Sequence, residues 1–520
     1  MRPMVTLAAV MNNAAKYEVS AKEIIMVQPR TSVHGSFVRM LPLGLLYAVS
    51  KIVHEGYPVH ILDARISPSS DEHDLDQMIN ANTLIVGISV MSGVSVIESI
   101  RLSRAVKARH PHVFVVWGGP HPTFSPRDVL QETSVDYVVR GYGSEPFREL
   151  VRRLADEPGA KSLNNITGLS WRDEQGQAHH NEVVPDFEFI DYHDIPYRLI
   201  PYLSVYKYFD KHEVVFPMYS TMGCPYQCAF CSSPALFSKF ARKWSPYPVE
   251  DVVAHIAMVQ EKYGATMIYF IDDDSFVDLK HVDAIIDEIK RRNIRIKLGF
   301  RGARINEILG MSDIFLEKMA DAGVNVLHIG AESGCDRLLA LMRKNITTAQ
   351  TLEANRKLAR HPRITALYNF VVGYPTETLE ETMMTRDHIL QLIRDNPLCI
   401  VLPLNKLKPL PGTELYALAV RCGYVPPVTL AGWGDYEQES ADYNPVWMTR
   451  KHNQFIRMMY LSMYFIDDKM LKMSSGLSLK YVFFRIFARL YRPIALFRFK
   501  HGIYQMLVED WIYSIVKRFI

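Results

Sequence analysis

The sequence lacks the features of a disulfide-rich, membrane-spanning or strongly charged protein. Six cysteines in 520 residues form no disulfide framework, and so few are typical of a reducing cytoplasm. Basic and acidic side chains nearly balance, at 59 against 56, so no overall field favours nucleic acid as a partner. No run of about 18 apolar residues is present, which argues against a spanning helix. With 48% apolar residues, the sequence predicts a cytoplasmic chain of two or three globular domains.

The first 155 residues alternate short apolar runs with segments of helical spacing. Five runs have the length and composition of buried strands: Glu23–Val27, Val59–Asp63, Leu84–Ser89, Val113–Gly118 and Asp136–Arg140. The segments between them repeat apolar residues at helical intervals. Strands that alternate with helices predict right-handed crossovers and a parallel, doubly wound sheet. Such a sheet binds ligands at the carboxyl ends of its strands.

Three loops at the predicted strand ends combine glycine with polar residues. They are Ser89–Gly93, Gly118–Thr123 and Arg140–Glu145. Glycine allows the backbone to approach a bulky ligand closely, and small hydroxyl groups can contact the edge of that ligand. Ordinary turns between strand and helix explain the same residues equally well, so this pattern by itself leaves the ligand open.

Residues 156–211 break the alternation and form the predicted linker. Ile166–Asp173 and His180–Pro185 have the pattern of a small hairpin around Glu174-Gln175-Gly176. The stretch that follows is rich in Asp, Tyr and Pro and poor in Gly and Ser. This composition predicts an ordered connector across both domains rather than a flexible tether.

The alternation resumes at residue 212 and continues to residue 430. Six strand-like runs are present: Glu213–Tyr219, Thr266–Ile271, Ile296–Phe300, Asn325–Gly330, Thr365–Val372 and Cys399–Lys406. Helical segments separate these runs, so the pattern predicts a partial (β/α)6 barrel. The active site of such a barrel lies at the C-terminal ends of its strands.

A cysteine triplet follows the first of these strands. Cys224, Cys228 and Cys231 have C-x3-C-x2-C spacing, which can place three thiolates on one side of a small metal centre. Iron–sulfur clusters normally bind four thiolates, so three would leave one iron open to another ligand. Structural zinc needs four ligands, and no fourth Cys or His lies between Tyr219 and Phe240. Unrelated buried cysteines are the other alternative, and spacing this tight favours the cluster.

Polar residues also follow the next strands of the predicted barrel. The run Asp272-Asp273-Asp274-Ser275 is compatible with a solvated turn, a helix cap, or a site for a cation or amine. Arg301 and Arg304 suit a carboxylate, although a surface pair explains them nearly as well. Glu332 ends the fourth strand, where a buried acid needs a partner. A ligand is the better explanation for Glu332.

These barrel motifs resemble those of radical S-adenosylmethionine (SAM) enzymes. The triplet, with Phe230 before its last cysteine, is similar to their C-x3-C-x-aromatic-C signature. Gly330–Gly334 resembles their GxESG segment, Val372–Glu377 their GxPgET turn, and Leu410–Glu414 their PGTel segment. The resemblance implies a partial barrel that binds a 4Fe–4S cluster and SAM.

The first domain resembles the flavodoxin or Rossmann-like cobalamin-binding domain that is fused to many radical SAM enzymes. The similar segments are PLGLL at Pro42–Leu46, GGPHPT at Gly118–Thr123 and DYVVRGYGSE at Asp136–Glu145. One departure stands out. The Asp-x-His-x-x-Gly motif, whose histidine ligates cobalt in cobalamin mutases, is absent, as it commonly is in the radical SAM subgroup.

The resemblance also implies a set of site residues. Cys224, Cys228 and Cys231 would hold the cluster, whose open iron binds SAM. Contacts with SAM would come from Phe230, Asp272, Asp273, Arg301, Glu332, Ser333 and Val372. Contacts with cobalamin would come from Ser89, Ser92, Gly93, Gly118, Gly119, His121, Gly141 and Glu145. Cys335 is a candidate catalytic residue, with an inert buried thiol as the alternative.

The activity that this family implies is methyl transfer to an unactivated carbon. One SAM methylates cobalamin, a second yields a 5′-deoxyadenosyl radical that takes hydrogen from the substrate, and the substrate radical collects the methyl group. A radical SAM oxidative cyclase or rearrangement enzyme, resembling the anaerobic magnesium-protoporphyrin ester cyclases and acting on a tetrapyrrole- or lipid-like substrate, is one alternative. An iron–sulfur or cobalamin sensor or electron carrier is another. The expected partners are a small-molecule substrate and an external electron donor such as flavodoxin or ferredoxin.

Residues 431–520 lose the α/β alternation and are predicted to form a helical region. Arg485, Arg489 and Arg492 fall at helical spacing among aromatic residues. Basic amphipathic helices of this kind can lie in a membrane interface, which would make the protein membrane-peripheral and favour a lipophilic substrate. The alternative is a set of helices packed against the barrel with their arginines outward.

Overall fold

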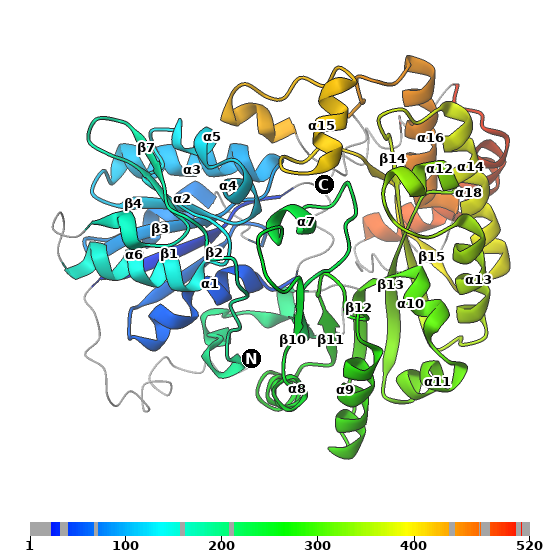
Figure 1. Ribbon diagram of the computed structural model, residues 1–520, viewed down its shortest axis with the longest axis horizontal. Coiled ribbons are helices and arrows are strands. Elements are labelled where there is room, and N and C mark those ends of the chain that lie inside the picture. The colour runs from blue at the N-terminus through cyan, green and yellow to red at the C-terminus, as the bar shows by residue number, and fades with distance from the viewer. Residues whose placement is uncertain are drawn as a thin grey trace.

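The computed structural model of the protein describes residues 22–31, 40–66, 71–156, 162–206, 213–435, 443–466 and 479–505, together with residues 469 and 511. Figure 1 shows a first sheet on the left and a barrel on the right, with α7 (Ser233–Leu236) between them. This is the mixed α/β architecture that the sequence predicts. Residues 1–21 of the predicted first domain lie outside the described residues.

The first sheet has seven strands in the order β2-β1-β3-β4-β5-β6-β7. Their bounds are β1 Glu23–Gln28, β2 Val59–Asp63, β3 Thr83–Ser89, β4 Phe114–Gly118, β5 Tyr137–Val139, β6 Leu169–Arg172 and β7 Ala178–His180. The strands β1 to β5 are parallel, and Val27 of β1 pairs with both Leu62 and Ile88. The chain reverses its strand order between β1 and β3, at the point where doubly wound sheets bind ligands. The predicted doubly wound sheet is therefore confirmed.

Helices cover both faces of the first sheet. Their bounds are α1 Leu43–His54, α2 Asp71–Met78, α3 Val94–Arg109, α4 Pro120–Phe124, α5 Pro126–Leu130 and α6 Ser144–Asp156. β3 is buried along almost its whole length, as a parallel strand covered on both faces must be. Leu45 of α1 and Leu150 of α6 lie in the core on one face, and Val96 of α3 lies in the core on the other.

The predicted linker contributes to both domains. Its hairpin forms β6 and β7, which add to the edge of the first sheet in antiparallel orientation, so the sheet extends past residue 155. Farther along, the Tyr206 hydroxyl donates to Asp63 of β2 at 3.0 Å. Tyr197 lies 3.1 Å from Nε2 of His255 on α8 (Val249–Tyr263). The connector lies across both domains because its aromatic residues have partners in each.

The barrel sheet has the order β15-β14-β13-β12-β11-β8, and β16 also pairs with β14. Its strands are β8 Val215–Met218, β11 Met267–Phe270, β12 Lys297–Ala303, β13 Val324–Glu332, β14 Thr365–Val372, β15 Ile400–Val401 and β16 Asn405–Lys406. All pairs are parallel. The sixth predicted strand is divided around Pro403, which has no N–H to donate to a ladder. The predicted partial barrel is confirmed.

Helices cover the outside of the barrel. Besides α8 they are α9 Leu279–Arg291, α10 Ile305–Gly310, α11 Asp313–Asp321, α12 Asp336–Leu341, α13 Thr348–Ala359 and α14 Leu379–Asp395. Thr347 and Thr378 cap α13 and α14, each with a reciprocal bond from Gln350 or Glu381, as a capping box requires. A large apolar core lies between these helices and the strands. The outward-facing side chains are therefore used for packing, and chemistry is left to the inner faces and the strand ends.

The C-terminal region is helical where the structure describes it, as predicted. After α15 (Glu414–Arg421), which still belongs to the predicted barrel region, come the short 3₁₀ segment η7 Leu430–Asp435, α16 Arg450–Ile466 and α18 Leu479–His501. η7 returns to the first domain, where the N–H of Gly93 donates to the carbonyl of Trp433 at 3.0 Å. None of the helices in the described part of the chain combines the length and the apolar character needed to cross a bilayer.

Candidate active site

The cysteine loop begins at a position that requires glycine. β9 (Thr221–Gly223) pairs with β10 (Trp244–Pro246), and Gly223 has a φ of +80°. A Cβ atom there would lie 2.4 Å from the carbonyl oxygen of Lys243 and 2.5 Å from the ring of Phe187. Only glycine fits this turn, which carries the chain from the C-terminal edge of the barrel to Cys224.

Two donors reach the sulfur atoms of the loop. Arg304 donates from Nη1 to Sγ of Cys228 at 3.4 Å, and the backbone N–H of Ser233 donates to Sγ of Cys231 at 3.5 Å. Burial raises the pKa of the free Cys224 thiol. Bound iron would instead lower the pKa of Cys224, because a metal ion deprotonates the thiols that ligate it.

Arg304 is held beside the cysteines on several sides. Its guanidinium lies 3.8 Å from the centroid of the Tyr226 ring, its Nη2 donates to the carbonyl of Lys344, and the residue is 4% exposed. Tyr226 in turn donates to Glu307 at 2.7 Å, and Glu307 accepts the N–H of Arg304 at 3.0 Å. The result is a fixed positive charge at the edge of the cysteine loop.

Two buried donors without partners fit a cluster at this place. Within the described residues, Nε of Arg304 and the hydroxyl of Tyr374 are buried and have no hydrogen-bond partner. Burial, together with the charges of Glu332, Glu377 and Cys228, raises the pKa of Tyr374, and its ring lies 6.4 Å from that of Phe230 in the cysteine loop. An unpartnered buried donor costs about 1–3 kcal/mol. The sulfur atoms of an iron–sulfur cluster accept hydrogen bonds and would satisfy both donors.

The cysteine loop offers no site for a single metal ion. Among the residues that the structure describes, no group of three or more His, Cys, Asp or Glu side chains is arranged to hold one. In a cubane cluster each thiolate binds a different iron, so the loop remains compatible with a cluster.

Asp272, predicted to contact SAM, has the acceptor positions of its carboxylate occupied by donors within the protein. Its carboxylate accepts the N–H groups of Ser220 and Thr221 and the hydroxyls of Ser220 and Ser275, at 2.5–3.1 Å. Four donors fill the acceptor positions of a carboxylate. Asp272 therefore holds the turn before β9 and has no capacity left for an amine.

Asp273 and Arg301 face a shared space at the barrel mouth. Both are exposed, and they continue the inward-facing positions of β11 and β12 that carry Tyr269 and Gly299. The surrounding protein still raises the pKa of Asp273, and the cation of Arg301 opposes that rise. Oδ1 of Asp273 also accepts the hydroxyl of Ser233 at 3.1 Å, just after the cysteine triplet. A carboxylate and a cation are thus both accessible to one ligand there.

A polar layer lies farther inside the barrel. Nδ1 of His328 lies 3.1 Å from the Tyr269 hydroxyl, and its Nε2 lies 2.6 Å from the amide nitrogen of Asn369. Burial, helped by the cation of Arg301, lowers the pKa of His328 to about 4, so the imidazole is neutral at pH 7. His328 and Asn369 are half-buried although they lie in interior strands of the barrel sheet.

Glu332 is fixed at the end of β13 by a buried ion pair. Its Oε1 accepts from Nζ of Lys344 at 2.8 Å, and each side chain is 8% exposed. Its φ of +64° is uncommon for a residue other than glycine. A Cβ atom at Gly330 would lie 2.2 Å from this Oε1, so glycine makes room for the carboxylate.

Ser333 and Val372 do not face the barrel mouth. Ser333 is buried, and its hydroxyl accepts the N–H of Cys335 at 3.2 Å and lies 3.3 Å from the hydroxyl of Thr385. Val372 has its side chain in the outer core, and its carbonyl accepts the N–H of Leu407 at 2.8 Å. Ser333 therefore supports the turn after β13, and the Val372 side chain packs in the core between the strands and the outer helices.

Phe230 and Cys335 have defined neighbours. The ring of Phe230 packs edge-to-face on Tyr374 with centroids 6.4 Å apart. The thiol of Cys335 donates to Glu381 at 3.4 Å, and burial raises its pKa. A buried, protonated thiol is a poor nucleophile, which favours the inert alternative for Cys335.

Glu377 shapes the turn after β14. Its carboxylate accepts the N–H groups of Gly373 and Tyr374 at 2.6 and 2.8 Å and the hydroxyl of Thr382 at 2.7 Å. Burial nevertheless raises the pKa of Glu377 to about 7. Through these hydrogen bonds, Glu377 holds the turn that carries Tyr374.

Replacement of Glu377 by glutamine is expected to flatten the pH dependence of stability. The folded-state pKa of about 7 lies above the ordinary value of 4.5, so the unfolded chain releases its proton first and stability falls as pH rises between these values. The amide oxygen of glutamine can still accept the N–H groups of Gly373 and Tyr374, and its NH2 group can donate to the Thr382 hydroxyl, without the charge. The gain of Glu377→Gln over wild type should grow by up to about 3 kcal/mol from about pH 5 to about pH 8, measured by chemical denaturation.

Glu381→Gln, four residues later in the first turn of α14, is the matched control. The Arg337 side chain lowers the pKa of Glu381 to about 2, so this carboxylate stabilises the fold at neutral pH and the effect of its removal has the opposite sign. A Glu377→Gln profile parallel to that of the wild type would contradict the assignment.

In the first domain, the strand ends meet around His121. Oγ of Ser92 lies 2.9 Å from Nδ1 of His121, and the ring of Trp433 meets the imidazole edge-on at 5.5 Å. Burial lowers the pKa of His121 to about 4, and its Nε2 is buried without a partner among the described residues. A neutral imidazole with an unused nitrogen at the switch-point edge fits a ligand such as cobalamin.

The glycines beside His121 shape this edge. Ser89 pairs with Gly118 in the sheet register, so β3 and β4 end together. Gly119 has a φ of +100°, and a Cβ atom there would lie 3.0 Å from the carbonyl oxygen of Val90. Gly93 also has a positive φ, of +111°. Two of these glycines therefore serve tight turns, which is the ordinary explanation left open by the sequence.

Gly141 belongs to the loop after β5, and Glu145 lies in the first turn of α6. The N–H of Gly141 donates to the hydroxyl of Thr123 at 3.1 Å, which ties this loop to the one after β4. The carboxylate of Glu145 accepts from Lys51 at 2.7 Å and also from Arg148. Lys51 lies on α1 and Arg148 lies on α6. The Glu145 carboxylate therefore joins these two helices and does not line the strand-end edge.

The edges of the two domains face each other across α7. A Cβ atom at Gly412 would lie 3.2 Å from Phe124 of α4 and 3.5 Å from Ala235 of α7, so the loop after β4 adjoins the helix after the cysteines. From the loop after β5, the ring of Tyr142 lies 6.3 Å from that of Phe240. Both edges thus border the region between the domains (Figure 1).

Sequence reasoning missed the residues that support the site. Lys344 and Trp433 belong to no motif, and nothing in their local sequence marks a buried cation or an aromatic cover. Arg304 was predicted to bind a carboxylate with Arg301, but it points at Cys228 instead. The aromatic residue two positions after the first cysteine, Tyr226, was the one available signal for a stacking partner.

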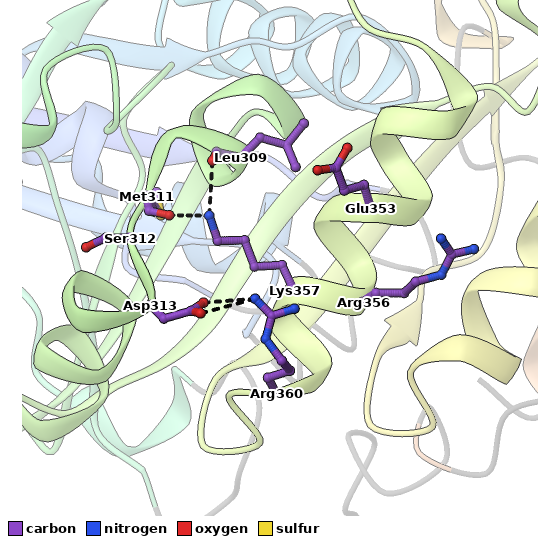
Figure 2. A pocket seen from close by; sticks show the side chains of 8 residues that line it. All are labelled: Leu309, Met311, Ser312, Asp313, Glu353, Arg356, Lys357 and Arg360. Carbon is purple, nitrogen blue, oxygen red and sulfur yellow. Dashed lines mark hydrogen bonds and ion pairs between the residues drawn. The ribbon is translucent and has the colours of Figure 1, made fainter.

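A separate pocket of about 410 Å³ lies among the outer helices of the barrel (Figure 2). Its lining residues are Leu309, Met311, Ser312, Asp313, Glu353, Arg356, Lys357 and Arg360. Lys357 donates to the carbonyls of Leu309 and Met311, and Arg360 donates to Asp313 at 3.0 Å. Because these charges are bonded to their neighbours and no predicted site residue lines the pocket, it is not part of the candidate site.

Known families match both halves of the chain. The Radical SAM superfamily matches residues 218–389, and the B12 binding domain matches residues 36–151. An uncharacterised methyltransferase of Pyrococcus horikoshii is 31% identical over 383 residues, which cover 73% of this chain and 78% of that one. The anaerobic magnesium-protoporphyrin IX monomethyl ester cyclase of Synechocystis is 25% identical and covers 68% and 69%. The hopanoid C-3 methylase of Methylococcus capsulatus is 24% identical and covers 73% and 68%.

Solved structures share the fold. The cobalamin-dependent SAM radical enzyme OxsB, with aqua-cobalamin bound, has a TM-score of 0.67 at 16% identity and covers 96% of this chain and 75% of that one. The radical SAM methyltransferase TsrM of Kitasatospora setae has a TM-score of 0.62 at 18% identity and covers 79% and 81%. At these identities the likeness concerns the fold.

The cysteine loop, the two matched families and the Pyrococcus relative lead to one conclusion. Buried donors at the loop fit a cluster, and the unused nitrogen of His121 fits a ligand at the opposite edge. The chain belongs to the radical SAM enzymes that carry a cobalamin-binding domain, whose cofactors are a 4Fe–4S cluster, SAM and cobalamin.

Proposed function

We propose that this enzyme transfers a methyl group to an unactivated carbon of a small molecule. The observation that carries the proposal is the opposition of the two edges, with Phe124 beside α7 and Tyr142 beside Phe240. A methyl donor held at the first edge and a radical source held at the second can then act on one substrate between them. The methyltransferase and methylase among the relatives support this reading.

We assign the residues of the barrel edge to the cluster and SAM. The three cysteines of the loop hold the cluster, Asp273 and Arg301 bind the amino and carboxylate groups of SAM, and Glu332 bonds to its ribose hydroxyls. Phe230 packs along the bound SAM from the cysteine loop. When bound, the cluster and SAM supply a radical that removes hydrogen, and cobalamin supplies the methyl group.

We assign cobalamin binding and the exclusion of water to the strand-end edge of the first domain and the residues around it. His121 and Ser92 contact the cofactor, with Trp433 packed against the imidazole. Tyr142 and Phe240 form part of an aromatic wall near α7. An aromatic wall keeps water and stray hydrogen donors from reactive intermediates.

Turnover with SAM that carries a deuterated methyl group tests the proposal. Mass spectrometry then follows the label into the corrinoid extracted from the protein and into the product. Methyl transfer predicts label in both. The cyclase or rearrangement alternative, which the Synechocystis relative supports, predicts 5′-deoxyadenosine without labelled product. The assay uses an external one-electron donor such as flavodoxin or ferredoxin.

Replacement of Arg304 by glutamine is expected to lower the reduction potential of the cluster. The reduced cluster carries one more negative charge, and the guanidinium beside Cys228 stabilises that charge through a hydrogen bond to the sulfur. Loss of the cation therefore favours the oxidised form, by tens of millivolts, where about 60 mV is tenfold for one electron. Anaerobic redox titration followed by electron paramagnetic resonance measures the shift.

Arg301→Gln is the matched control for this titration. Arg301 lies three residues earlier and is exposed at the barrel mouth, so its loss should weaken SAM binding and leave the potential of the SAM-free cluster almost unchanged. If Arg304→Gln and Arg301→Gln shift the potential equally, the specific role given to Arg304 is wrong.

A further inference from the structure

The last described helix, α18, packs on the barrel side through one face. Ala488, Tyr491, Ala495 and Phe499 are buried, and their spacing of three, four and four residues places them on one side of a helix. The ring of Tyr491 meets that of Phe465 on α16 edge-on at 5.4 Å. This face is therefore satisfied within the protein.

The opposite face of α18 is apolar and exposed. Ile486 is 52% exposed, Leu490 74%, Ile494 53% and Phe497 56%. Their spacing of four, four and three residues places them on a single side of the helix, away from α16. Single exposed apolar residues are ordinary, but a continuous stripe of large ones marks an interaction surface.

Charge on α18 has one sign. Residues 479–501 contain six lysines and arginines and no aspartate or glutamate. Arg489 and Lys500 are exposed and, on a helical projection, lie along one border of the apolar stripe, between it and the buried face. An apolar stripe bordered by basic residues is the arrangement of helices that lie in the plane of an anionic membrane surface.

We propose that α18 docks this protein on the surface of an anionic phospholipid bilayer. The stripe from Ile486 to Phe497 enters the boundary between headgroups and acyl chains, and Arg489 and Lys500 pair with lipid phosphates. The helix α18, which contains Pro493 and packs on α16 through its buried face, can lie flat on the bilayer surface. The proposal is independent of the methyl-transfer function, since binding requires neither SAM nor cobalamin.

Vesicle flotation with the full-length protein tests the docking. Vesicles of phosphatidylcholine with about 30% phosphatidylglycerol should retain the wild-type protein, and vesicles of phosphatidylcholine alone should retain it at least about tenfold less well. Added salt should release the protein, because screening weakens the attraction between its basic side chains and the lipid phosphates. The variant Ile486→Ser, Leu490→Ser, Ile494→Ser, Phe497→Ser should lose at least about tenfold in affinity and keep its cluster absorbance after reconstitution.

A matched variant controls for general surface apolarity. Ile314→Ser, Val425→Ser and Val428→Ser remove side chains that are 82%, 77% and 89% exposed outside α18, and this variant should bind vesicles like the wild type. Three results would overturn the proposal: no retention on anionic vesicles, equal retention of the α18 variant, or a dimer in light scattering that the α18 variant abolishes. The last result would assign the stripe to a second copy of the chain.

Discussion

Replacement of any one of Cys224, Cys228 and Cys231 by alanine is expected to abolish the cluster and reduce SAM cleavage to background. Two remaining thiolates would leave two irons of the cubane without a protein ligand, which is outside the usual ligation of such clusters. The loss should exceed the roughly 10- to 100-fold effect typical of residues that only support a metal ligand. Anaerobic reconstitution, iron analysis, visible absorbance and 5′-deoxyadenosine formation measure it.

Other cysteines of the same chain provide the control. Cys422 is half-buried at the end of α15, and Cys422→Ala should keep the full iron content and activity. Cys335→Ala tests the weaker hypothesis that this thiol is catalytic, and we expect it to keep SAM cleavage because the thiol is buried against Glu381. Retained iron and activity in a triplet variant would refute the assignment of the metal site.

Replacement of Lys344 by methionine is expected to destabilise the barrel and to impair SAM binding together. Glu332 and Lys344 are each 8% exposed and are paired at 2.8 Å, so removal of the lysine leaves a buried carboxylate without its counter-charge. Breaking a buried pair in this way costs about 3–5 kcal/mol. Chemical denaturation measures the free energy of unfolding, and calorimetry with SAM should show at least a roughly tenfold loss of affinity.

Two further variants separate the charge effect from general damage. The double variant Lys344→Met with Glu332→Gln should recover most of the stability, since no unpaired charge remains, but should still bind SAM weakly because the carboxylate is gone. Arg343→Met removes one partner of the pair with Glu414, in which the side chains are 56% and 55% exposed, and should cost less than about 1 kcal/mol. A Lys344→Met variant as stable as Arg343→Met would show that the buried pair does not hold the strand end.

Much of the architecture was predictable because it depends on short-range patterns. Apolar runs of strand length alternating with helical segments determine that β1 to β5 and the barrel strands are parallel. The division of the sixth barrel strand around Pro403 was not predicted. The hairpin at residues 169–180 was also recognisable from its turn. Its place on the edge of the first sheet was not, because strand pairing between distant segments leaves no local mark.

The cysteine loop could be located from its sequence because its ligands are separated by only a few residues and its position follows from the end of one strand. The supporting contacts could not be found in this way. Lys344 reaches Glu332, Arg304 turns to Cys228, and Trp433 covers His121. Each of these contacts depends on the direction of a side chain after packing, and that direction is set by the convergence of strand ends from distant parts of the chain. The local sequence around a polar residue therefore does not predict which distant residues its side chain will contact.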